Sequence, residues 1–397
     1  MQPTLNLTKK RIGSIDLLRG SVMIIMALDH VRDYFHADAY LYDPLDLNKA
    51  SVALFFTRWI THFCAPIFML LAGTAAFLNG QKKTKKELSG FLLKRGLWLI
   101  LLELVVVNFG WNFDISFTNI YFITIWALGV SMIVLAGLIH LPKMLILIIG
   151  VVLVMGHDLL DNIHVTGNTL PAFGWALLHD QAFFSWQGKN VLVGYPVLPW
   201  IGIMALGYCL GNLYTPAFEA AKRKKMLLIM GASAIALFIV IRFINVYGDP
   251  HPWTHQSSPV YTLLSFLKVN KYPPSLLYAL MTLGPALLFL SVTENANNGV
   301  SKIISVYGRV PMFYYLLHIF IIHIATLLAA GLFTTFSWHV WILKEPLWFT
   351  KTLVGYGFSL GVVYLVWMAI VAGAYPLCKW YDNYKTNHKE KWWLSYL

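Results

Sequence analysis

The stretch RIGSIDLLRGSVMIIMALDHVRDYFH, residues 11–36, places acids, bases and a cation within a segment long enough to cross a membrane. Asp16, Arg19, His30 and Asp33 recur, with two methionines, at steps of three and four residues. On an α-helix this spacing puts them on one stripe. Ionisable groups inside a membrane are costly unless they face a cavity or a partner. The stripe is therefore predicted to line a functional site.

The two ends of this stripe differ in chemistry. At about 1.5 Å per residue, Arg19 and His30 are roughly 16 Å apart along the axis, about half of a bilayer core. The helix thus carries a basic site toward one membrane face and a histidine–carboxylate cluster toward the other. Two structural alternatives are open. Asp16 and Arg19 can form a simple i,i+3 pair, and His30 can be a core histidine bonded to a neighbouring helix.

The composition is that of an integral membrane protein. Of the 397 residues, 58% are hydrophobic and only 12% are charged, and the mean hydropathy is +0.63. Several apolar runs exceed the length needed to span hydrocarbon. The lysines and arginines that give the net charge of +12 cluster in short loops between apolar runs, which is typical of membrane topology. No nucleic-acid motif is present. We therefore expect a lipid bilayer, and no nucleic acid, as a partner.

The basic clusters set the expected topology. Residues 9–11, QKKTKKE at 81–87, KRKK at 222–225 and KTNHKEK at 385–391 are predicted to be cytoplasmic. This predicts one all-α domain, residues 1–397: a polytopic membrane helical bundle of about ten transmembrane helices with both termini in the cytoplasm. The expected spans are 12–35, 52–78, 93–108, 121–138, 144–154, one beginning at 194, 226–246, one opened by the prolines at 273 and 274, 304–329 and 352–375. The polar stretch 157–190 between two of them is long enough to be functional or to cover a site.

With this orientation the polar residues fall into two layers. The outer layer combines an imidazole with carboxylates and aromatic rings, the groups used for acid–base chemistry on a polar substrate. Its members are Asp29, His30, Arg32, Asp33, His36, the turn around Asp114, Tyr195, Trp200, His251, His255, Lys271, Tyr272 and Ser275.

The inner layer is almost entirely cationic. It contains Asp16, Arg19, Lys94, Arg95 and Arg309. Arg309 is expected to open a helix beside Gly308, where its guanidinium suits a phosphate group. Asp16 is the one carboxylate close in sequence to these cations, so an anionic ligand is expected to neutralise them.

Other enzyme signatures are missing from the sequence. There is no HExxH, GxSxG or phosphate-cradling glycine loop, which argues against a hydrolase or nucleotidase. His318 and His323 are five residues apart and do not share a helix face, so we expect no metal there and no metal cofactor elsewhere in the protein. For His318 we expect pairing within the bundle instead.

Several motifs occur in order along nearly the whole chain. They are R-x-x-S-I-D-x-L-R-G at 11–20, D-H-x-R-D at 29–33, WITHFCAPIF at 59–68, YPVLPW at 195–200, KYPPSL at 271–276 and GRVPMFYYLLH at 308–318. Together they resemble bacterial membrane proteins related to heparan-alpha-glucosaminide N-acetyltransferase. The ten residues between Arg19 and His30 also resemble the Arg-to-His motif of the wider acyltransferase-3-like superfamily.

This resemblance implies a ten-span acyltransferase in the bacterial cytoplasmic (inner) membrane. It would move an acyl group from cytoplasmic acyl-CoA, acetyl-CoA being the expected donor, to a hydroxyl or amine on the far side. The essential histidine of the wider superfamily falls on His30. In the glucosaminide acetyltransferases this position resembles an asparagine, and their active-site histidine is nearest to His36. We favour His30, which needs no gap and lies on the stripe.

The resulting hypothesis assigns a role to each layer. His30 is the general base or a transient acyl carrier, oriented by Asp33 or Asp29 and assisted by His36. Arg309 binds a CoA phosphate, while Arg19, paired with Asp16, lines the entry of the pantetheine arm. The residues expected to contact a sugar-type acceptor are Arg32, Trp200, Lys271, Tyr272 and Ser275.

A second hypothesis comes from a different class of protein. A proton-coupled transporter or lipid flippase could use the same His, Asp and Arg residues as a relay. Self-association into a homo-oligomer is compatible with either hypothesis.

Overall fold

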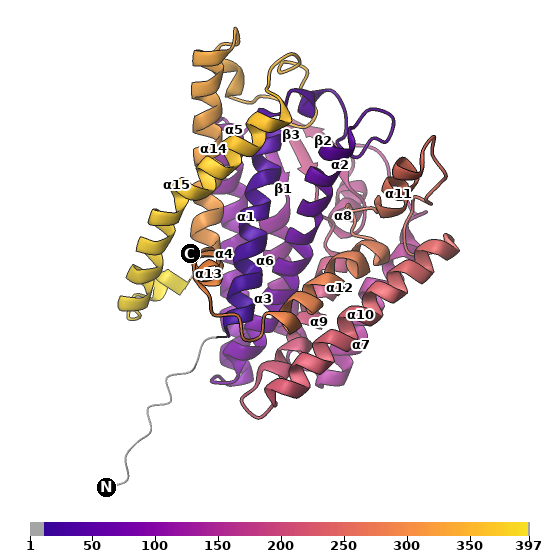
Figure 1. The fold of residues 1–397 in the computed structure, drawn as a ribbon, viewed down its shortest axis with the longest axis vertical. Helices are drawn as coiled ribbons and strands as arrows, with labels where there is room; N and C mark the ends of the chain where they lie inside the picture. The colour runs from indigo at the N-terminus through magenta and orange to yellow at the C-terminus, as the bar shows by residue number, and fades with distance from the viewer. Residues whose placement is uncertain (1–11, 396–397) are drawn as a thin grey trace.

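Helix α1 (Gly13–Phe35) runs through the middle of a helical bundle (Figure 1). The computed structural model describes residues 12–395, so the basic residues 9–11 lie outside the described part. Most of α1 is buried, and it packs against helices α3, α12, α13, α14 and α15. Its stripe of ionisable residues therefore faces other helices or cavities inside the protein.

Each expected span contains a helix. In order, the helices are α1, α2 (Val52–Trp59) with α3 (Cys64–Gly80), α4 (Lys85–Leu102) continued by a π-helix (Glu103–Val107) and α5 (Asn108–Asn112), α6 (Thr124–Leu138), α7 (Lys143–Gly156), α9 (Leu198–Leu210), α10 (Ala220–Ile244), α12 (Leu276–Val292), α14 (Pro311–Phe333) and α15 (Leu360–Asn387). Shorter elements are the 3₁₀ helices Ala37–Tyr40, Ile60–Phe63, His157–Leu160, Gly211–Tyr214, Trp338–Trp341 and Trp392–Ser395, and helices α8 (Leu170–Leu178), α11 (Pro259–Leu267) and α13 (Gly299–Arg309).

The length and apolar character of these helices confirm an integral membrane protein. In the described part of the chain, five helical segments are long and apolar enough to cross a membrane: 52–80, 143–160, 220–244, 311–333 and 360–387. Three shorter apolar helices accompany them: Thr124–Leu138, Leu198–Tyr214 and Leu276–Val292. Ten crossings and cytoplasmic termini stay predictions.

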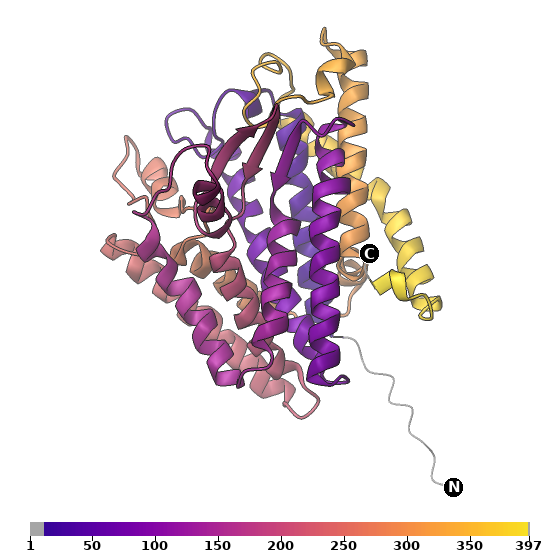
Figure 2. The same ribbon diagram turned by 180° about the vertical axis from the view of Figure 1, so that it is seen from behind.

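The all-α prediction was wrong in one region, which holds a small sheet (Figure 2). Strand β3 (Lys189–Val193) lies between β1 (Asn119–Phe122), which is parallel to it, and β2 (Ala182–Trp186), which is antiparallel. Gln187 and Gly188 join β2 to β3 with φ values of 49° and 74°, as in a tight type I′ hairpin. The stretch read as a polar loop therefore contains helix α8 and a hairpin, because its apolar and aromatic residues bury one face against each other.

A second correction concerns Arg309, which ends helix α13 and does not begin a span. Val310 leaves the helical conformation, with φ −127° and ψ 49°, and Pro311 starts α14. A proline fixes φ and lacks an N–H, so it is favoured at the first turn of a helix. The prolines at 273 and 274 lie just before α12, whose N-cap is Ser275.

Helices α1 and α13 approach each other closely at two glycines. A Cβ on Gly308 would lie 1.9 Å from the carbonyl oxygen of Asp16, and one on Gly20 would lie 2.0 Å from that of Ile304. No side chain fits at either position without moving the backbone. This contact brings Arg309 beside Arg19, whose Nη1 donates to the Gly308 carbonyl oxygen at 3.0 Å.

We expect Gly308→Ala to separate α1 from α13. Overpacking of this kind costs about 1–3 kcal/mol, so the melting temperature in detergent should fall. Gly299→Ala is the matched control, because a Cβ there, at the start of the same helix, meets nothing within 4 Å. Equal melting temperatures for the two variants would contradict the close contact.

Candidate active site

Three cavities follow one another along α1. The arginine cavity, about 290 Å³, lies beside Arg19 and Arg309. The carboxylate cavity, about 450 Å³, lies beside Asp29 and Asp33 at the other end of the helix. Between them is a neck of about 40 Å³. The neck shares Met26, Phe68, Thr124 and Tyr315 with the arginine cavity, and Asp29, His30, Thr124, Tyr195 and Lys271 with the carboxylate cavity.

The arginine cavity is cationic at its wide end and apolar toward the neck. Arg19, Arg95, Arg309 and Lys385 line it, and no carboxylate does among the described residues. Its other walls are mostly methionine, phenylalanine and aliphatic side chains. The arrangement suits an anionic head followed by a slender apolar arm.

The two predicted arginines each have a carboxylate partner behind the cavity wall. Arg19 lies 3.4 Å from Asp16, which was expected. Arg309 lies 2.7 Å from Asp382 of α15, a partner 73 residues away that the sequence analysis did not identify. The expectation that only a ligand neutralises Arg309 was therefore wrong. Its guanidinium still faces the cavity.

His30 and His318 form a hydrogen-bonded pair at the neck. His30 Nδ1 lies 2.7 Å from His318 Nε2, and His318 Nδ1 lies 2.8 Å from the carbonyl oxygen of Tyr314. A carbonyl only accepts, so His318 carries its proton on Nδ1 and its Nε2 accepts from His30. His30 Nε2 is then left with a lone pair. This pairing within the bundle is the role expected for His318.

The carboxylates near His30 are bound to arginines. Asp29 lies 2.5 Å from Arg58 and 2.9 Å from Arg32, and Arg32 also lies 2.5 Å from Asp33. Asp33 accepts a further bond from Trp348 Nε1 at 3.2 Å. His30 is thus hydrogen-bonded to His318, and no hydrogen bond joins it to Asp29 or Asp33 in the described part of the chain; an orienting role for either carboxylate stays a prediction. The two carboxylates neutralise the guanidinium groups of Arg32 and Arg58, whose side chains are 5% and 14% exposed.

Lys271 brings a cation next to His30. It is 8% exposed and lines both the neck and the carboxylate cavity. Its Nζ lies 5.2 Å from the ring centroid of Tyr272, whose hydroxyl accepts from Arg58 at 3.4 Å. Among residues 12–395, no carboxylate lies within ion-pair distance of Lys271. Its charge is therefore directed at the cavity.

The remaining predicted residues separate into two groups. His36 lines the carboxylate cavity beyond the end of α1. Burial lowers the pKa of its imidazole, an effect that Asp38 opposes. Trp200 and Ser275 line none of the three cavities: Trp200 is fully buried against Tyr195, and Ser275 caps α12 and donates to Asp249 at 2.8 Å. Direct contact of Trp200 or Ser275 with a substrate in these cavities is thus not supported.

Sequence reasoning missed four residues of the site. Arg58, Tyr315 and Asp382 were not selected, and Thr124, which lines all three cavities, was not either. A signal existed for Arg58, because an arginine in the apolar run after residue 52 needs a buried partner. Thr124 and Tyr315 have no such signal, since they are ordinary residues of apolar helices.

The fold and site define a membrane-embedded helical protein with a histidine pair where two polar cavities meet. A family profile described as "Heparan-alpha-glucosaminide N-acetyltransferase, catalytic" matches residues 11–243. The match covers more than half of the 397 residues, and the chain belongs to this family of membrane acetyltransferases. No curated protein matches the chain significantly. The matched range includes His30 and Arg58 and ends before Lys271, Arg309 and His318.

We expect Asp29→Asn to destabilise the protein strongly. It leaves Arg58 and Arg32 with less negative charge in a buried setting, and breaking a buried ion pair costs about 3–5 kcal/mol. Thermal unfolding in detergent measures the effect. Asp46→Asn is the control, since Asp46 faces Lys49 at 3.9 Å on the surface and its loss should cost less than about 1 kcal/mol. An unchanged melting temperature of the Asp29→Asn protein would mean that Asp29 and its two arginine partners are solvated.

Proposed function

We propose that the protein transfers an acyl group, acetyl in the first instance, from acyl-CoA to a hydroxyl or amine of a sugar-type acceptor. Acyl-CoA enters from the cytoplasm, and the acceptor is reached on the opposite side of a bacterial inner membrane. The observation that carries this proposal is the position of His30, at a neck between a cationic cavity and an acidic, aromatic one. Family membership supports the acetyl group and the transferase class.

The arginine cavity supports CoA as the donor. CoA offers several phosphate charges, which guanidinium groups bind by charge and fork geometry. Arg309 and Arg19 lie at the wide end, and Met23 and Met26 continue along α1 toward the neck. An uncharged pantetheine arm laid along these methionines brings its thioester to Tyr315 and Thr124, within reach of His30.

The residues at the neck supply the chemistry of acyl transfer. His30 Nε2 accepts the proton of the acceptor O–H or N–H while the acceptor atom bonds to the thioester carbonyl carbon. Lys271 stabilises the negative charge that develops on the carbonyl oxygen. The C–S bond then breaks, and the leaving thiolate takes the proton from His30 to give free CoA. His318 holds His30 in the tautomer that this step needs.

The carboxylate cavity supports the part of the proposal that concerns the acceptor. Its Trp111, Tyr272 and Trp348 offer ring faces, and Asp33, His36 and Asp38 offer acceptors for hydroxyl groups. Rings combined with carboxylates suit a sugar or another small polar acceptor.

We expect His30→Ala to reduce acetyl transfer by about 10²- to 10⁴-fold, the usual contribution of a general base. His318→Ala should lower kcat more than it changes KM for the acyl donor, because His318 lines none of the three cavities and acts on the reaction through its bond to His30. The measurement is acetyl-CoA-dependent labelling of glycans in vesicles that contain the purified protein. His140→Ala, a variant of an exposed histidine, is the control.

Two outcomes of that experiment would contradict the proposal. Full activity of His30→Ala would remove His30 from the reaction. Movement of a glycan or lipid across the vesicle membrane without any acyl donor would instead identify a transporter or flippase.

We expect Arg309→Ala to weaken acetyl-CoA binding. Loss of one charge-assisted contact costs about 1.5–3 kcal/mol, or roughly 10- to 150-fold in affinity. The acetyl-CoA affinity of Arg309→Lys should lie between those of the wild type and Arg309→Ala, because lysine keeps the charge and loses the forked guanidinium geometry. Titration calorimetry on the detergent-solubilised protein gives the dissociation constants.

The control for this titration is Lys302→Ala, which removes an exposed cation from the same helix outside the cavity. Because Arg309 also binds Asp382, the melting temperature of each variant must be recorded. A well-folded Arg309→Ala protein with unchanged donor affinity would show that Arg309 only joins α13 to α15.

A further inference from the structure

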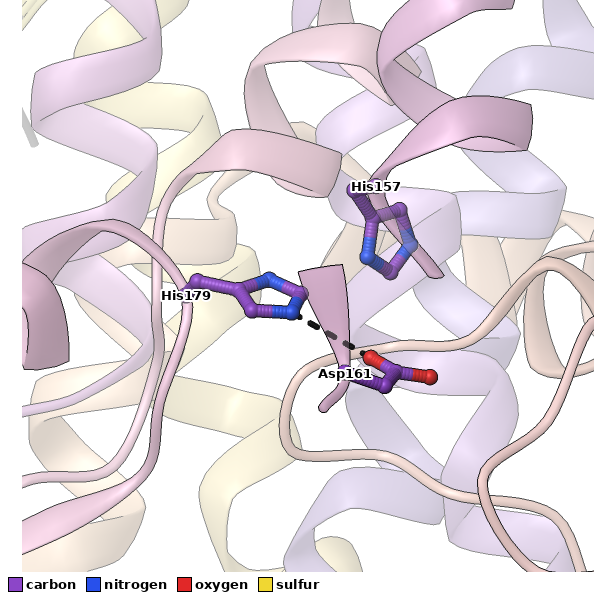
Figure 3. Close-up of side chains that lie close together, drawn as sticks. All are labelled: His157, Asp161 and His179. Carbon is purple, nitrogen blue, oxygen red and sulfur yellow. Dashed lines mark ion pairs between the residues drawn. The ribbon is translucent and has the colours of Figure 1, made fainter. Parts of the chain in front are cut away.

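Away from the three cavities, two histidines and a carboxylate converge at the end of α7. His157 and Asp161 lie four residues apart at the 3₁₀ turn that follows α7, and His179 lies just after α8. Figure 3 shows the two rings and the carboxylate turned toward one another. One nitrogen or oxygen from each residue lies within 4.8 Å of the others. His179 Nε2 and Asp161 Oδ1 are 3.2 Å apart.

The histidines of this cluster are buried, and each has its Nε2 within 3.1–3.2 Å of a carboxylate oxygen. His157 is 2% exposed and His179 is fully buried. Neither ring nitrogen of either residue has an aligned hydrogen-bond partner in the described part of the chain. An unsatisfied buried polar atom costs about 1–3 kcal/mol, so a ligand bound by both rings and the Asp161 carboxylate would be stabilised at this place. The ligand must accept lone pairs, because imidazole nitrogens and a carboxylate all offer them.

We propose that His157, Asp161 and His179 bind a divalent transition-metal ion, Zn²⁺ being the ion that this donor set fits best. Two imidazoles and one carboxylate are a common set of protein ligands for zinc. Bonds of about 2.0–2.2 Å in tetrahedral geometry place ligand atoms about 3.3–3.5 Å apart. The 3.2 Å between His179 and Asp161 is close to this separation, and rotation of the His157 side chain would bring its ring nitrogen from within 4.8 Å to the same distance.

Asp158 belongs to the surroundings of this site. Its Oδ1 lies 3.1 Å from His157 Nε2, and its Oδ2 accepts from the backbone N–H of Leu276 at 3.1 Å. Carboxylates in this position orient metal-bound histidines and raise their basicity. We therefore assign Asp158 to positioning His157 and leave the fourth coordination position of the metal to water.

The metal would fasten the α8–β2–β3 segment to the helical bundle. His179 caps the C-terminal end of α8, shortly before β2, and Gln181 and Leu192 of the same segment line the carboxylate cavity. His157 and Asp161 belong to the end of α7, and Asp158 reaches the start of α12. One ion thus joins three parts of the chain and braces a wall of that cavity. The site does not depend on the proposed acyl transfer.

The test is zinc binding by the full-length protein, purified in detergent through a tag that contains no histidine. The protein is stripped with a chelator, dialysed and titrated with Zn²⁺, while bound metal and melting temperature are measured. We expect one zinc per chain and a higher melting temperature, because a ligand that binds only the folded form stabilises it. His179→Ala and Asp161→Asn should each lower the affinity more than about 10- to 100-fold, the loss typical of changing an outer partner of a metal site.

The matched control is His164→Ala. His164 lies in the same segment, is exposed and contacts Asp180 at 3.1 Å, outside the cluster. Its variant should bind zinc as the wild type does. Asp161→Asn keeps the shape of the side chain, so it remains informative where His179→Ala fails to fold. Wild-type protein that takes up no zinc, or zinc binding that is equal in wild type, His179→Ala and Asp161→Asn, would overturn the proposal.

Discussion

The structure depends on how α1 keeps its charges inside a membrane protein. An ionised carboxylate or guanidinium away from water costs several kcal/mol unless it is paired and hydrogen-bonded. Asp29 meets this requirement with two guanidinium groups, those of Arg32 on its own helix and Arg58 on α2. The pairing fixes α2 against α1 and leaves His30, one residue further on, facing the neck. The same charges that hold the helices together therefore also shape the cavity.

Spacing along one helix predicted part of this site. The stripe on α1, the helices of the bundle and the cationic cavity opposite a histidine–carboxylate cluster all follow from the 3.6-residue period and the cost of buried charge. Contacts between distant segments do not follow from these local rules. Asp382 lies 73 residues from Arg309, and no local pattern indicates that α15 crosses α13. Pairing of His318 within the bundle was expected, but its partner His30 was not identified for the same reason, because the two lie 288 residues apart.

The errors in the fold have local causes. A span was expected to run through Arg309, because the apolar run continues, but the proline two residues later starts a new helix. The small sheet was missed because its strands have four or five residues each, too few for alternation to differ clearly from an apolar loop. The short elements matter for function. The break after α13 turns the Arg309 side chain into the arginine cavity, and the hairpin forms a wall of the carboxylate cavity.

In the proposed acyl transfer, the size of the neck bears on which acyl group is accepted. Its volume of about 40 Å³ leaves room for only a few water-sized groups. A thioester carbonyl with a methyl group fits this space, whereas a long acyl chain requires Phe68, Met26 or Tyr315 to move. A narrow neck also keeps bulk water from the carbonyl carbon, since water competes with the acceptor for the same acyl group. If the protein catalyses the proposed reaction, close packing around His30 therefore favours both a short acyl group and transfer over hydrolysis.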